Sequence, residues 1–160
     1  MQIKNRIIFI IICFLSLSGI NINLYADEFN ISALEITIDK KNEIVVGKGS
    51  VEVSDKQGRI IKSDNATYEK TKEFLLTEGS VEFFDTEGNI ITTDRATYDK
   101  KNEIITTYNN SELTIKDGYK LTSNKVLYDT TKKIISSDQN ATFIDNDGNI
   151  VKVSMFQYHI

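Results

Sequence analysis

The feature that most limits how this chain can fold is a repeat of about 30 residues, which recurs without insertions. The stretch "GSVEVSDKQGRIIKSDNATYEK" (49–70) returns as "GSVEFFDTEGNIITTDRATYDK" (79–100). A fixed period of about 20–50 residues is typical of proteins that stack one small structural unit many times. The same offset relates two further sets of residues: Gly58, Gly88, Gly118 and Gly148, and Tyr68, Tyr98, Tyr128 and Tyr158.

Each of the four units (41–70, 71–100, 101–130 and 131–160) contains two β-rich segments separated by a turn. Val51 and Val53 share one face of the first segment, and Ala66 and Tyr68 share one face of the second. Apolar residues that alternate with polar ones predict an antiparallel sheet with one solvated face. Asp-Gly and Glu-Gly pairs between such segments predict hairpin turns, because glycine accepts positive φ.

The residues therefore predict a string of antiparallel hairpins, one per unit, in which equivalent side chains recur on one face. Gly49 and Gly79 interrupt the long first strand of their units, which predicts a bulge or a bend at each. No segment of 27–160 keeps a helical apolar period, so we predict no helix there. Proline is absent, and Val, Ile, Thr, Tyr and Phe, which favour a pleated and half-buried surface, are frequent.

The first 26 residues have the organisation of a secretory signal peptide. Lys4 and Arg6 precede an apolar run at 7–17, and small Ala26 stands before Asp27. The alternative is a membrane anchor, but the apolar run is shorter than the about 20 residues that a span needs. We predict cleavage after Ala26 and one domain over 27–160.

Charge and cysteine content exclude some classes of function. Without the signal peptide the chain has 17 basic and 23 acidic residues, a formal charge of −6. It therefore lacks the basic footprint of a nucleic-acid-binding protein. Cys13, the only cysteine, lies in the signal peptide, so we predict no disulfide in the exported chain.

No set of residues has the pattern of an enzyme or metal site. His159 is the only histidine, and no Gly-x-Ser-x-Gly motif accompanies it. "DNDGN" (145–149) resembles part of a calcium loop, but Phe143 stands where that spacing needs an acidic residue. "GKGS" (47–50) lacks the full phosphate-loop pattern. We interpret these as a surface residue, a hairpin turn and a strand bend, and we predict no catalytic residue, metal or cofactor.

The cadence "G-S-V-E…D-x-x-G-x-I-I-x-[ST]-D-x-A-T-Y", at 49–68 and 79–98 behind a signal peptide, resembles the LptA/OstA family of lipopolysaccharide transport. The resemblance covers nearly all of 27–160. It implies an all-β fold, an OstA-like antiparallel β-jellyroll whose two sheets open as a V. Within the family, the regular units are most similar to the N-terminal periplasmic domain of LptD. A stand-alone, LptA-like bridge is the alternative.

The resemblance also implies a function without catalysis. Such a module binds lipopolysaccharide, conducts the acyl chains of lipid A along an apolar groove toward the outer membrane, and stacks on other Lpt jellyrolls through its edge strands. It implies a location in the periplasm or at the periplasmic face of the outer membrane. The residues expected to line the groove are Val51, Val53, Ala66, Tyr68, Val81, Phe83, Ala96, Tyr98, Leu113, Val126, Tyr128, Phe143 and Phe156.

Two features depart from the family. The LptD proteins that this chain resembles use cysteines to join the N-terminal domain to the barrel, so disulfide-controlled maturation is not implied here. In addition, no barrel follows "SMFQYHI" (154–160), which indicates either a fragment of a longer protein or an edge strand for a partner.

The other hypothesis is a repetitive β-rich spacer or surface adhesin, in which the same residues only pack a core. The two hypotheses differ in the interior. A transport module should leave a groove between its sheets, whereas a spacer should be packed solid.

Overall fold

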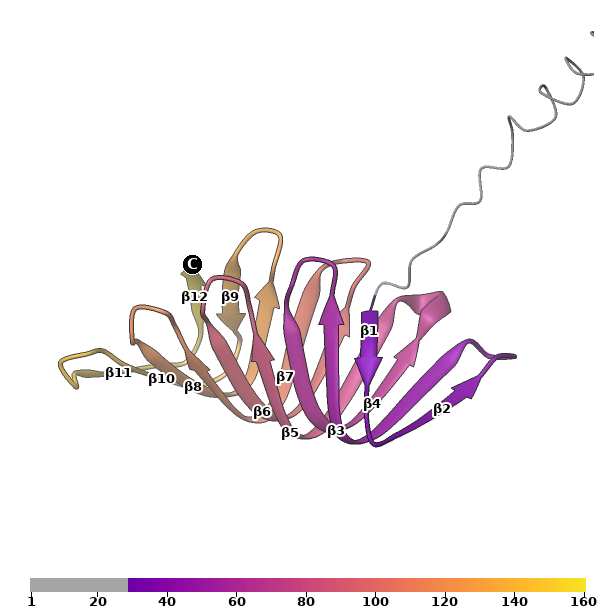
Figure 1. Cartoon of the computed structure of the whole chain (residues 1–160). Helices are drawn as coiled ribbons and strands as arrows, with labels where there is room; N and C mark the ends of the chain where they lie inside the picture. Colours follow the sequence, from indigo (N-terminus) through magenta and orange to yellow (C-terminus); the bar gives the residue numbers. More distant parts are fainter. Residues whose placement is uncertain (1–28) are drawn as a thin grey trace, which may run out of the picture.

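The structure, a computed structural model, describes residues 29–160, so the predicted signal peptide (1–26) lies outside the described residues. All strands in this range belong to one antiparallel 12-stranded sheet (Figure 1). The one helical element among these residues is a 3-10 turn, η1 (Lys70–Lys72). The all-β prediction is therefore confirmed. The strands are β1 (Phe29–Ser32), β2 (Glu35–Asp39), β3 (Ile44–Asp55), β4 (Ile60–Glu69), β5 (Phe74–Phe84), β6 (Ile90–Asp99), β7 (Ile104–Thr114), β8 (Lys120–Asp129), β9 (Ile134–Ser137), β10 (Ala141–Ile144), β11 (Ile150–Val153) and β12 (Phe156–His159).

Each long first strand of a unit is interrupted near its middle by a bulge. In β3 the pairing register shifts between Lys48 and Val51, and the residues between them, Gly49 and Ser50, both have positive φ. The same shift occurs in β5 at Gly79 and Ser80 and in β7 at Asn109 and Asn110. Glycine and asparagine tolerate this left-handed backbone better than other residues. The predicted bend at the two glycines is confirmed.

The returning strands change the phase of their alternation at the same level. In β4, Ile61 and Ser63 are buried, and burial then resumes at Ala66 and Tyr68. The inward face thus shifts by one residue at 64–65, where the register with β5 also shifts. A simple period of two along the whole strand does not describe these strands.

The bulges divide the sheet into two halves. We define half-sheet A as β2, β9, β12 and the parts of the long strands that adjoin the loops between repeats. Half-sheet B contains β1, β10, β11 and the parts that adjoin the hairpin turns. The short strands fit this division, because β2 and β1 pair with opposite ends of β3. Likewise, β9 and β10 pair with opposite ends of β8.

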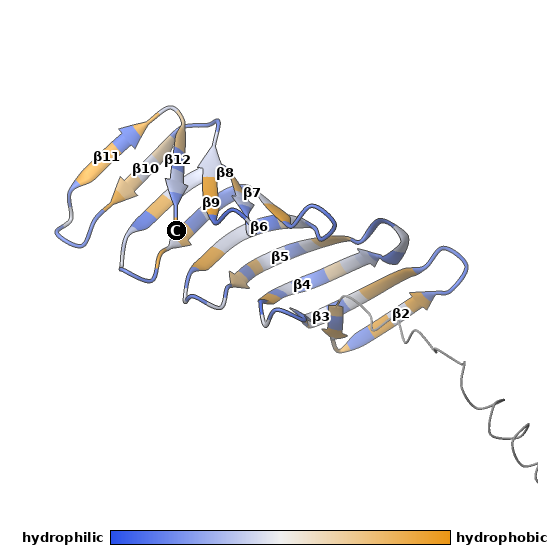
Figure 2. Ribbon diagram, turned by 90° about the horizontal axis from the view of Figure 1, so that it is seen from above, coloured by the Kyte–Doolittle hydropathy of each residue, from blue (hydrophilic) through white to orange (hydrophobic). Residues whose placement is uncertain are grey.

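The two halves are folded onto each other. Arg59, in the turn after β3, contacts Glu103, in the loop before β7, although these positions lie at opposite ends of the strands. Four aromatic pairs, with ring centroids 4.9–6.0 Å apart, also join half-sheet B to half-sheet A: Phe29–Tyr68, Phe29–Tyr98, Phe83–Tyr128 and Phe143–Phe156. A sheet folded in this way is the predicted jellyroll. Figure 2 shows its largely hydrophilic loops and its strands of alternating hydropathy.

Replacing Gly79 by alanine is expected to lower the free energy of unfolding by about 2 kcal/mol, because two effects add. Gly79 has φ +78°, and an added Cβ would lie 2.9 Å from the Cβ of Asp64. Gly148→Ala is the matched control, since Gly148 has φ +83° but nothing within 4 Å. The Gly148→Ala free energy of unfolding should fall by only about 1 kcal/mol, the cost of placing alanine at a positive φ. Urea unfolding of both variants measures the difference, and equal losses would show that Asp64 moves aside without cost.

Candidate functional site

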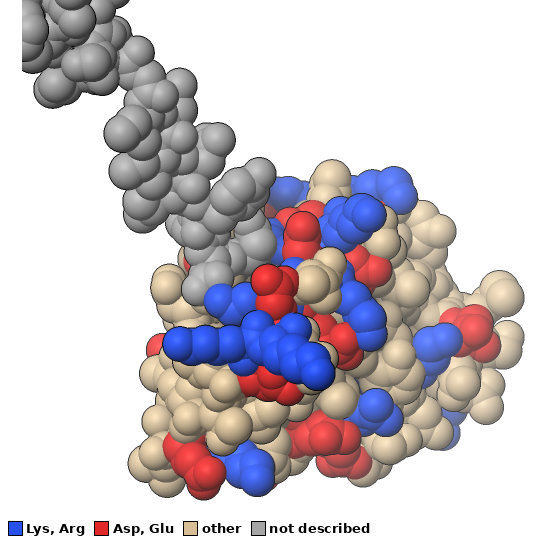
Figure 3. Space-filling view, turned by 90° about the vertical axis from the view of Figure 1, so that its right-hand side faces the viewer, with Lys and Arg blue, Asp and Glu red and all other residues tan. Residues whose placement is uncertain are grey.

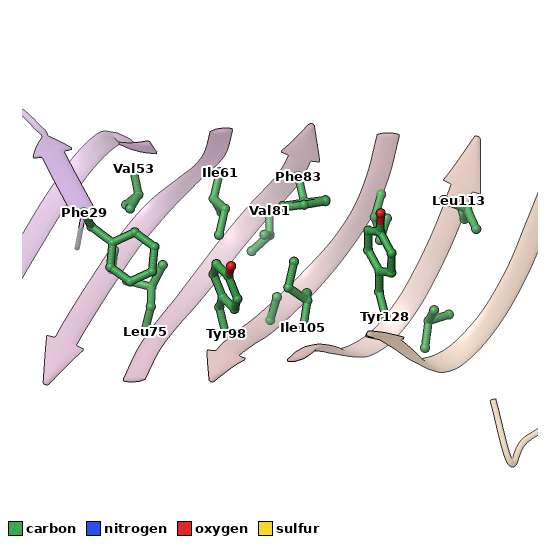
Figure 4. Packing of buried hydrophobic residues seen from close by; sticks show 14 of the residues in the cluster. Phe29, Val53, Ile61, Leu75, Val81, Phe83, Tyr98, Ile105, Leu113 and Tyr128 are labelled. Atoms are coloured by element: carbon green, nitrogen blue, oxygen red, sulfur yellow. The ribbon is translucent and has the colours of Figure 1, made fainter. Parts of the chain in front are cut away.

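The inner faces of the two half-sheets meet in one apolar cluster. Eleven of the thirteen residues expected to line a groove belong to its buried core, and Phe143 and Phe156 are partly buried against it. Figure 4 shows side chains of the two half-sheets, among them Tyr98 and Phe83, pointing into the space between them. All thirteen residues therefore face one shared interior, and their role in lining a path for lipid stays a prediction.

The cluster forms two continuous rows across neighbouring strands. In half-sheet A, tyrosines alternate with aliphatic residues that are their cross-strand partners. Half-sheet B carries a second apolar row opposite. Neighbouring strands are about 4.8 Å apart, so eight positions extend over roughly 34 Å along the jellyroll. The first row is Val45, Tyr68, Leu75, Tyr98, Ile105, Tyr128, Ile135 and Tyr158. The second row is Val53, Ile61, Phe83, Ile91, Leu113, Leu121, Phe143 and Val151.

Sequence reasoning missed about half of these positions. Val45, Leu75, Ile105 and Ile135 follow one another at the repeat period, so the repeat itself would have found them had it been applied to the start of each unit. A second set was hidden by the phase change in the returning strands. It consists of Ile61, Ile91 and Leu121.

The interior is closed in the middle of the jellyroll. The space enclosed there by Leu75, Phe83, Tyr98 and their neighbours has a volume of about 10 Å³. This is room for at most about one water molecule. An acyl chain would enter this part only if the half-sheets moved apart.

Both ends of the interior are open and apolar. At the β2 end, Phe29, Ile36 and Tyr68 help to line a hollow of about 180 Å³. At the β11 end, Phe143 and Val151 help to line a larger one of about 360 Å³. The second hollow falls within the range of pockets that hold small organic ligands, about 300–1,000 Å³.

The two half-sheets form a V that is joined at the bulges, and we call its opposite, open side the mouth. A network of polar side chains bridges this mouth over the closed middle of the interior. We name as the polar clasp Gln57 and Arg59, from the turn between β3 and β4, with Lys100 and Glu103, from the loop between β6 and β7. Arg59 donates to Glu103 at 2.8 Å, and Lys100 donates to Gln57 at 3.0 Å and also to Glu103. The clasp joins half-sheet B to half-sheet A with charged hydrogen bonds, which are stronger than neutral ones.

The two cations of the clasp are unusually well buried for charged side chains. Arg59 and Lys100 are both largely withdrawn from solvent, and so is Asp55, which accepts from the Arg59 Nε at 2.6 Å. Burial opposes the ionisation of Glu103, but hydrogen bonds from Lys100 and Tyr98 outweigh it and lower its pKa to about 2. Burial and the hydrogen bond to Glu103 raise the pKa of Tyr98 above its usual range. At neutral pH Glu103 is therefore charged and Tyr98 keeps its proton.

A second bridge occupies the equivalent place one repeat further on. Tyr128 donates to Asp85 at 3.2 Å, and Lys133 forms an ion pair with Glu87. Tyr128 and Asp85 occupy the positions that Tyr98 and Asp55 have one repeat earlier. Lys133 and Glu87 likewise replace Glu103 and Gln57. The ion pair of the second bridge is more exposed than the polar clasp, because the Lys133 and Glu87 side chains are 54% and 37% accessible.

This folded sheet has a counterpart among solved structures. The crystal structure of LptH from Pseudomonas aeruginosa, described as the LptA homologous periplasmic component of the lipopolysaccharide transport device, superposes with a TM-score of 0.63. The match covers 79% of this chain and 96% of LptH at 15% sequence identity. The chain has the fold of LptH. No family model matches the sequence, and no curated protein matches it either.

The likeness to LptH confirms the LptA-like jellyroll that was expected from the repeated cadence. It rests on the path of the chain, because identity at this level preserves few side chains. LptH is a component of a transport device.

The outer surface of this LptH-like fold is polar. A hollow of about 700 Å³ lies over β7, β8, β10 and β11, where Glu112, Thr122 and Lys152 alternate with inward apolar residues. At the β2 end, Figure 3 shows basic and acidic side chains next to one another. This mixture gives no single-sign surface for charge-driven capture at that end.

The motifs weighed for chemistry have structural roles in the LptH-like fold. Asp145 accepts hydrogen bonds from the backbone N–H groups of Asp147 and Asn149, within its own hairpin turn. His159 lies exposed on β12 beside Gln157, and 47–50 is the bend of β3. Within 29–160, no group of three His, Cys, Asp or Glu residues is close enough to hold a metal ion. The same residues contain no helix long and apolar enough to span a membrane.

Proposed function

We propose that this chain is a periplasmic module of lipopolysaccharide transport that conducts lipid A acyl chains along its inner apolar face. The observation that carries the proposal is the pair of continuous apolar rows, which run from one open end of the jellyroll to the other. LptH, which has the same fold, is a periplasmic component of such a transport device. The proposed role is non-enzymatic.

The chemistry of the two rows suits a hydrocarbon chain. Each buried CH₂ group contributes roughly 0.8 kcal/mol, and equivalent positions recur at every strand. A ligand can therefore shift by one strand without losing contact area, so no single position traps it. Because the chain is acidic overall, acyl-chain contact rather than attraction to phosphate groups has to supply most of the binding.

The edges of the sheet suit assembly with other jellyrolls. At one end β1 and β2 each pair on one side only, and β11 and β12 do so at the other. Leu34 and Ile38, and Ile150 and Met155, are exposed at these ends. Unpaired strands accept further strands through backbone hydrogen bonds. We propose stacking with other Lpt jellyrolls here, either as a stand-alone bridge or as the N-terminal domain of an LptD.

A second candidate function is the β-rich spacer or adhesin. The observation that favours it is the closed middle, where only about 10 Å³ is left between the half-sheets. In a spacer this packing is the final state, whereas in a transport module it has to open.

Photo-crosslinking to purified lipopolysaccharide distinguishes the two functions. An aryl azide, introduced as p-azidophenylalanine, replaces Phe143 at the β11 end or Phe83 in the closed middle. The matched control is Phe84, the neighbour of Phe83, whose ring packs near Lys62 on the outer face. We expect lipid adducts at Phe143 and Phe83 and none above background at Phe84.

The outcomes separate clearly. Adducts at neither inner position, in variants that keep the β-sheet circular dichroism signal, would favour the spacer. An adduct at Phe143 alone would show binding at the end hollow without conduction. Equal adducts at Phe83 and Phe84 would show that the lipid only coats the surface.

A further inference from the structure

We propose that the polar clasp is a gate: it keeps the middle of the interior closed, and its opening controls the passage of an acyl chain between the two end hollows. The proposal rests on the proposed transport function and adds its regulation. Three observations support it: the bridges lie over the closed part of the interior, Arg59 links the two half-sheets, and the clasp contacts Tyr98 beneath it.

The bridges coincide with the closed part of the interior. The residues of the clasp belong to the first three repeats, and those of the second bridge to the last three. Beneath the bridges, Tyr98, which donates to Glu103, and Phe83, which packs on Tyr128, line a residual space of about 10 Å³. At the β11 end the equivalent turn, 115–119, carries Ile115 and Tyr119, and the interior opens into about 360 Å³. At the β2 end, Phe29 and Ile31 occupy the corresponding level beside a hollow of about 180 Å³. The interior is thus closed where polar bridges cross the mouth and open where apolar residues replace them.

The clasp departs from the repeat at the residue that reaches across the mouth. The position of Arg59 is occupied by Asn89, Tyr119 and Asn149 in the other units. Asn89 is fully buried but stays within its own half-sheet, where it donates to Asp85 and accepts from the backbone of Lys116. Only arginine at this position provides a long, forked donor that reaches the opposite half-sheet.

Each nitrogen of the Arg59 guanidinium donates a hydrogen bond. Its Nη1 donates to Thr130 at 2.6 Å and its Nη2 to Glu103 at 2.8 Å, both in loops that adjoin half-sheet A. Its Nε donates to Asp55 in half-sheet B. One side chain therefore ties the two halves together at the rim.

The clasp also contacts the apolar row beneath it. Tyr98 donates to Glu103 at 2.7 Å, and the Arg59 guanidinium lies 5.3 Å from the centre of the Tyr98 ring. The same ring lines the closed middle with Leu75 and Phe83. An acyl chain that displaces Tyr98 has to break the Tyr98–Glu103 hydrogen bond, so ligand passage and clasp opening are coupled through this residue.

A gate of this kind suits a hydrocarbon path in water. With no ligand, a groove open along its whole length would expose about 30 Å of apolar surface and attract unrelated apolar partners. Each charged hydrogen bond at the rim contributes a free energy similar to that of burying a few CH₂ groups, so a ligand that buries several of these groups supplies enough free energy to open the clasp. The clasp thereby favours a closed resting state that a suitable lipid reverses.

The test locks and releases the clasp in a single protein. Cysteines replace Arg59 and Glu103 in a Cys13→Ser background, which leaves no other cysteine. A short bis-methanethiosulfonate joins the two cysteines in the locked sample. In the released sample, methyl methanethiosulfonate caps each cysteine separately, because a reducing thiol would destroy the aryl azide. The readout is the adduct between purified lipopolysaccharide and an aryl azide at Phe83, in the closed middle, compared with one at Phe143, in the end hollow.

If the clasp is a gate, cross-linking should lower the Phe83 adduct roughly ten-fold relative to the released sample and leave the Phe143 adduct unchanged. Glu103→Gln, which keeps the shape of the side chain but removes its charge, should raise the Phe83 adduct above that of the chain with an intact clasp. The control pair is Glu52→Cys with Lys62→Cys, cross-strand neighbours on the outer face of half-sheet B, where cross-linking should change neither adduct.

Each result has one meaning. Equal Phe83 adducts in the locked and released samples would overturn the gate while leaving the transport function intact. No adduct at Phe83 or Phe143 in any sample, including the chain with an intact clasp, would instead overturn the transport function itself. Because locked and released samples are the same protein, a folding defect would affect both and cannot imitate the expected difference.

Discussion

Replacing Arg59 by methionine is expected to lower the free energy of unfolding by about 3 kcal/mol and the melting temperature by roughly 10 °C. Methionine keeps a long side chain but removes every donor of the guanidinium. The Asp55 side chain, 1% exposed, then loses its 2.6 Å partner and keeps only the N–H groups of its own turn. A buried carboxylate without a cation is costly, because water cannot reach it to compensate.

The matched control is Arg95→Met. Arg95 also pairs with a carboxylate, Glu78, and also lies over a tyrosine, 5.6 Å from the ring centre of Tyr108. The pair differs in exposure, since the Arg95 and Glu78 side chains are 49% and 54% accessible. Its loss should cost no more than about 0.5 kcal/mol. Denaturant unfolding of both variants checks this, and equal losses would show that the burial of the clasp contributes nothing.

The fold could be predicted from the sequence because the same hairpin unit recurs four times. The positions of Tyr68 and Gly58 recur once in every unit, so one hairpin assignment determined the others. The bends at Gly49 and Gly79 were also predictable, since glycine inside a strand marks a backbone that other residues avoid. The bend at Asn109 and Asn110 was missed because asparagine in a strand is a weaker signal.

The folding of the sheet onto itself could be reached only through the resemblance to known jellyrolls. Alternation along a strand reports which residues share a face, but it does not report that the sheet bends or which way. The inner position of Ile61 depends on a one-residue phase change in β4, and neighbouring residues give no clear sign of it. Such a shift becomes visible only when the pairing register is known.

The polar clasp could not be predicted from the sequence. Arg59 and Glu103 are 44 positions apart and lie in different repeats, in turns that look solvated when read locally. A comparison of the repeats does not reveal these residues either, because it identifies what the repeats share, whereas the clasp depends on positions at which the repeats differ. Departures from a repeat are therefore a useful place to look for function in chains of this kind.

Replacing Leu75 by alanine is expected to lower the free energy of unfolding by about 3 kcal/mol. Leu75 has no exposed surface and lies between Tyr68 and Tyr98, its partners on the two neighbouring strands. Truncation removes buried methyl groups and leaves a cavity that two stiff rings on a hydrogen-bonded sheet cannot fill. The urea midpoint should fall with little change in slope, because the unfolded chain exposes nearly the same surface.

Leu34→Ala is the matched control, because Leu34 is 84% exposed at the junction between β1 and β2. The same atoms are removed, but they are already in contact with water, so the loss should stay within about 0.5 kcal/mol. Contacts between the two apolar rows over the whole length, and the clasp at the rim, are expected to hold the two half-sheets together. A loss at Leu75 no larger than that at Leu34 would mean that the half-sheets relax freely onto the cavity. The half-sheets would then move so easily in the closed middle that the clasp could not control the passage of an acyl chain.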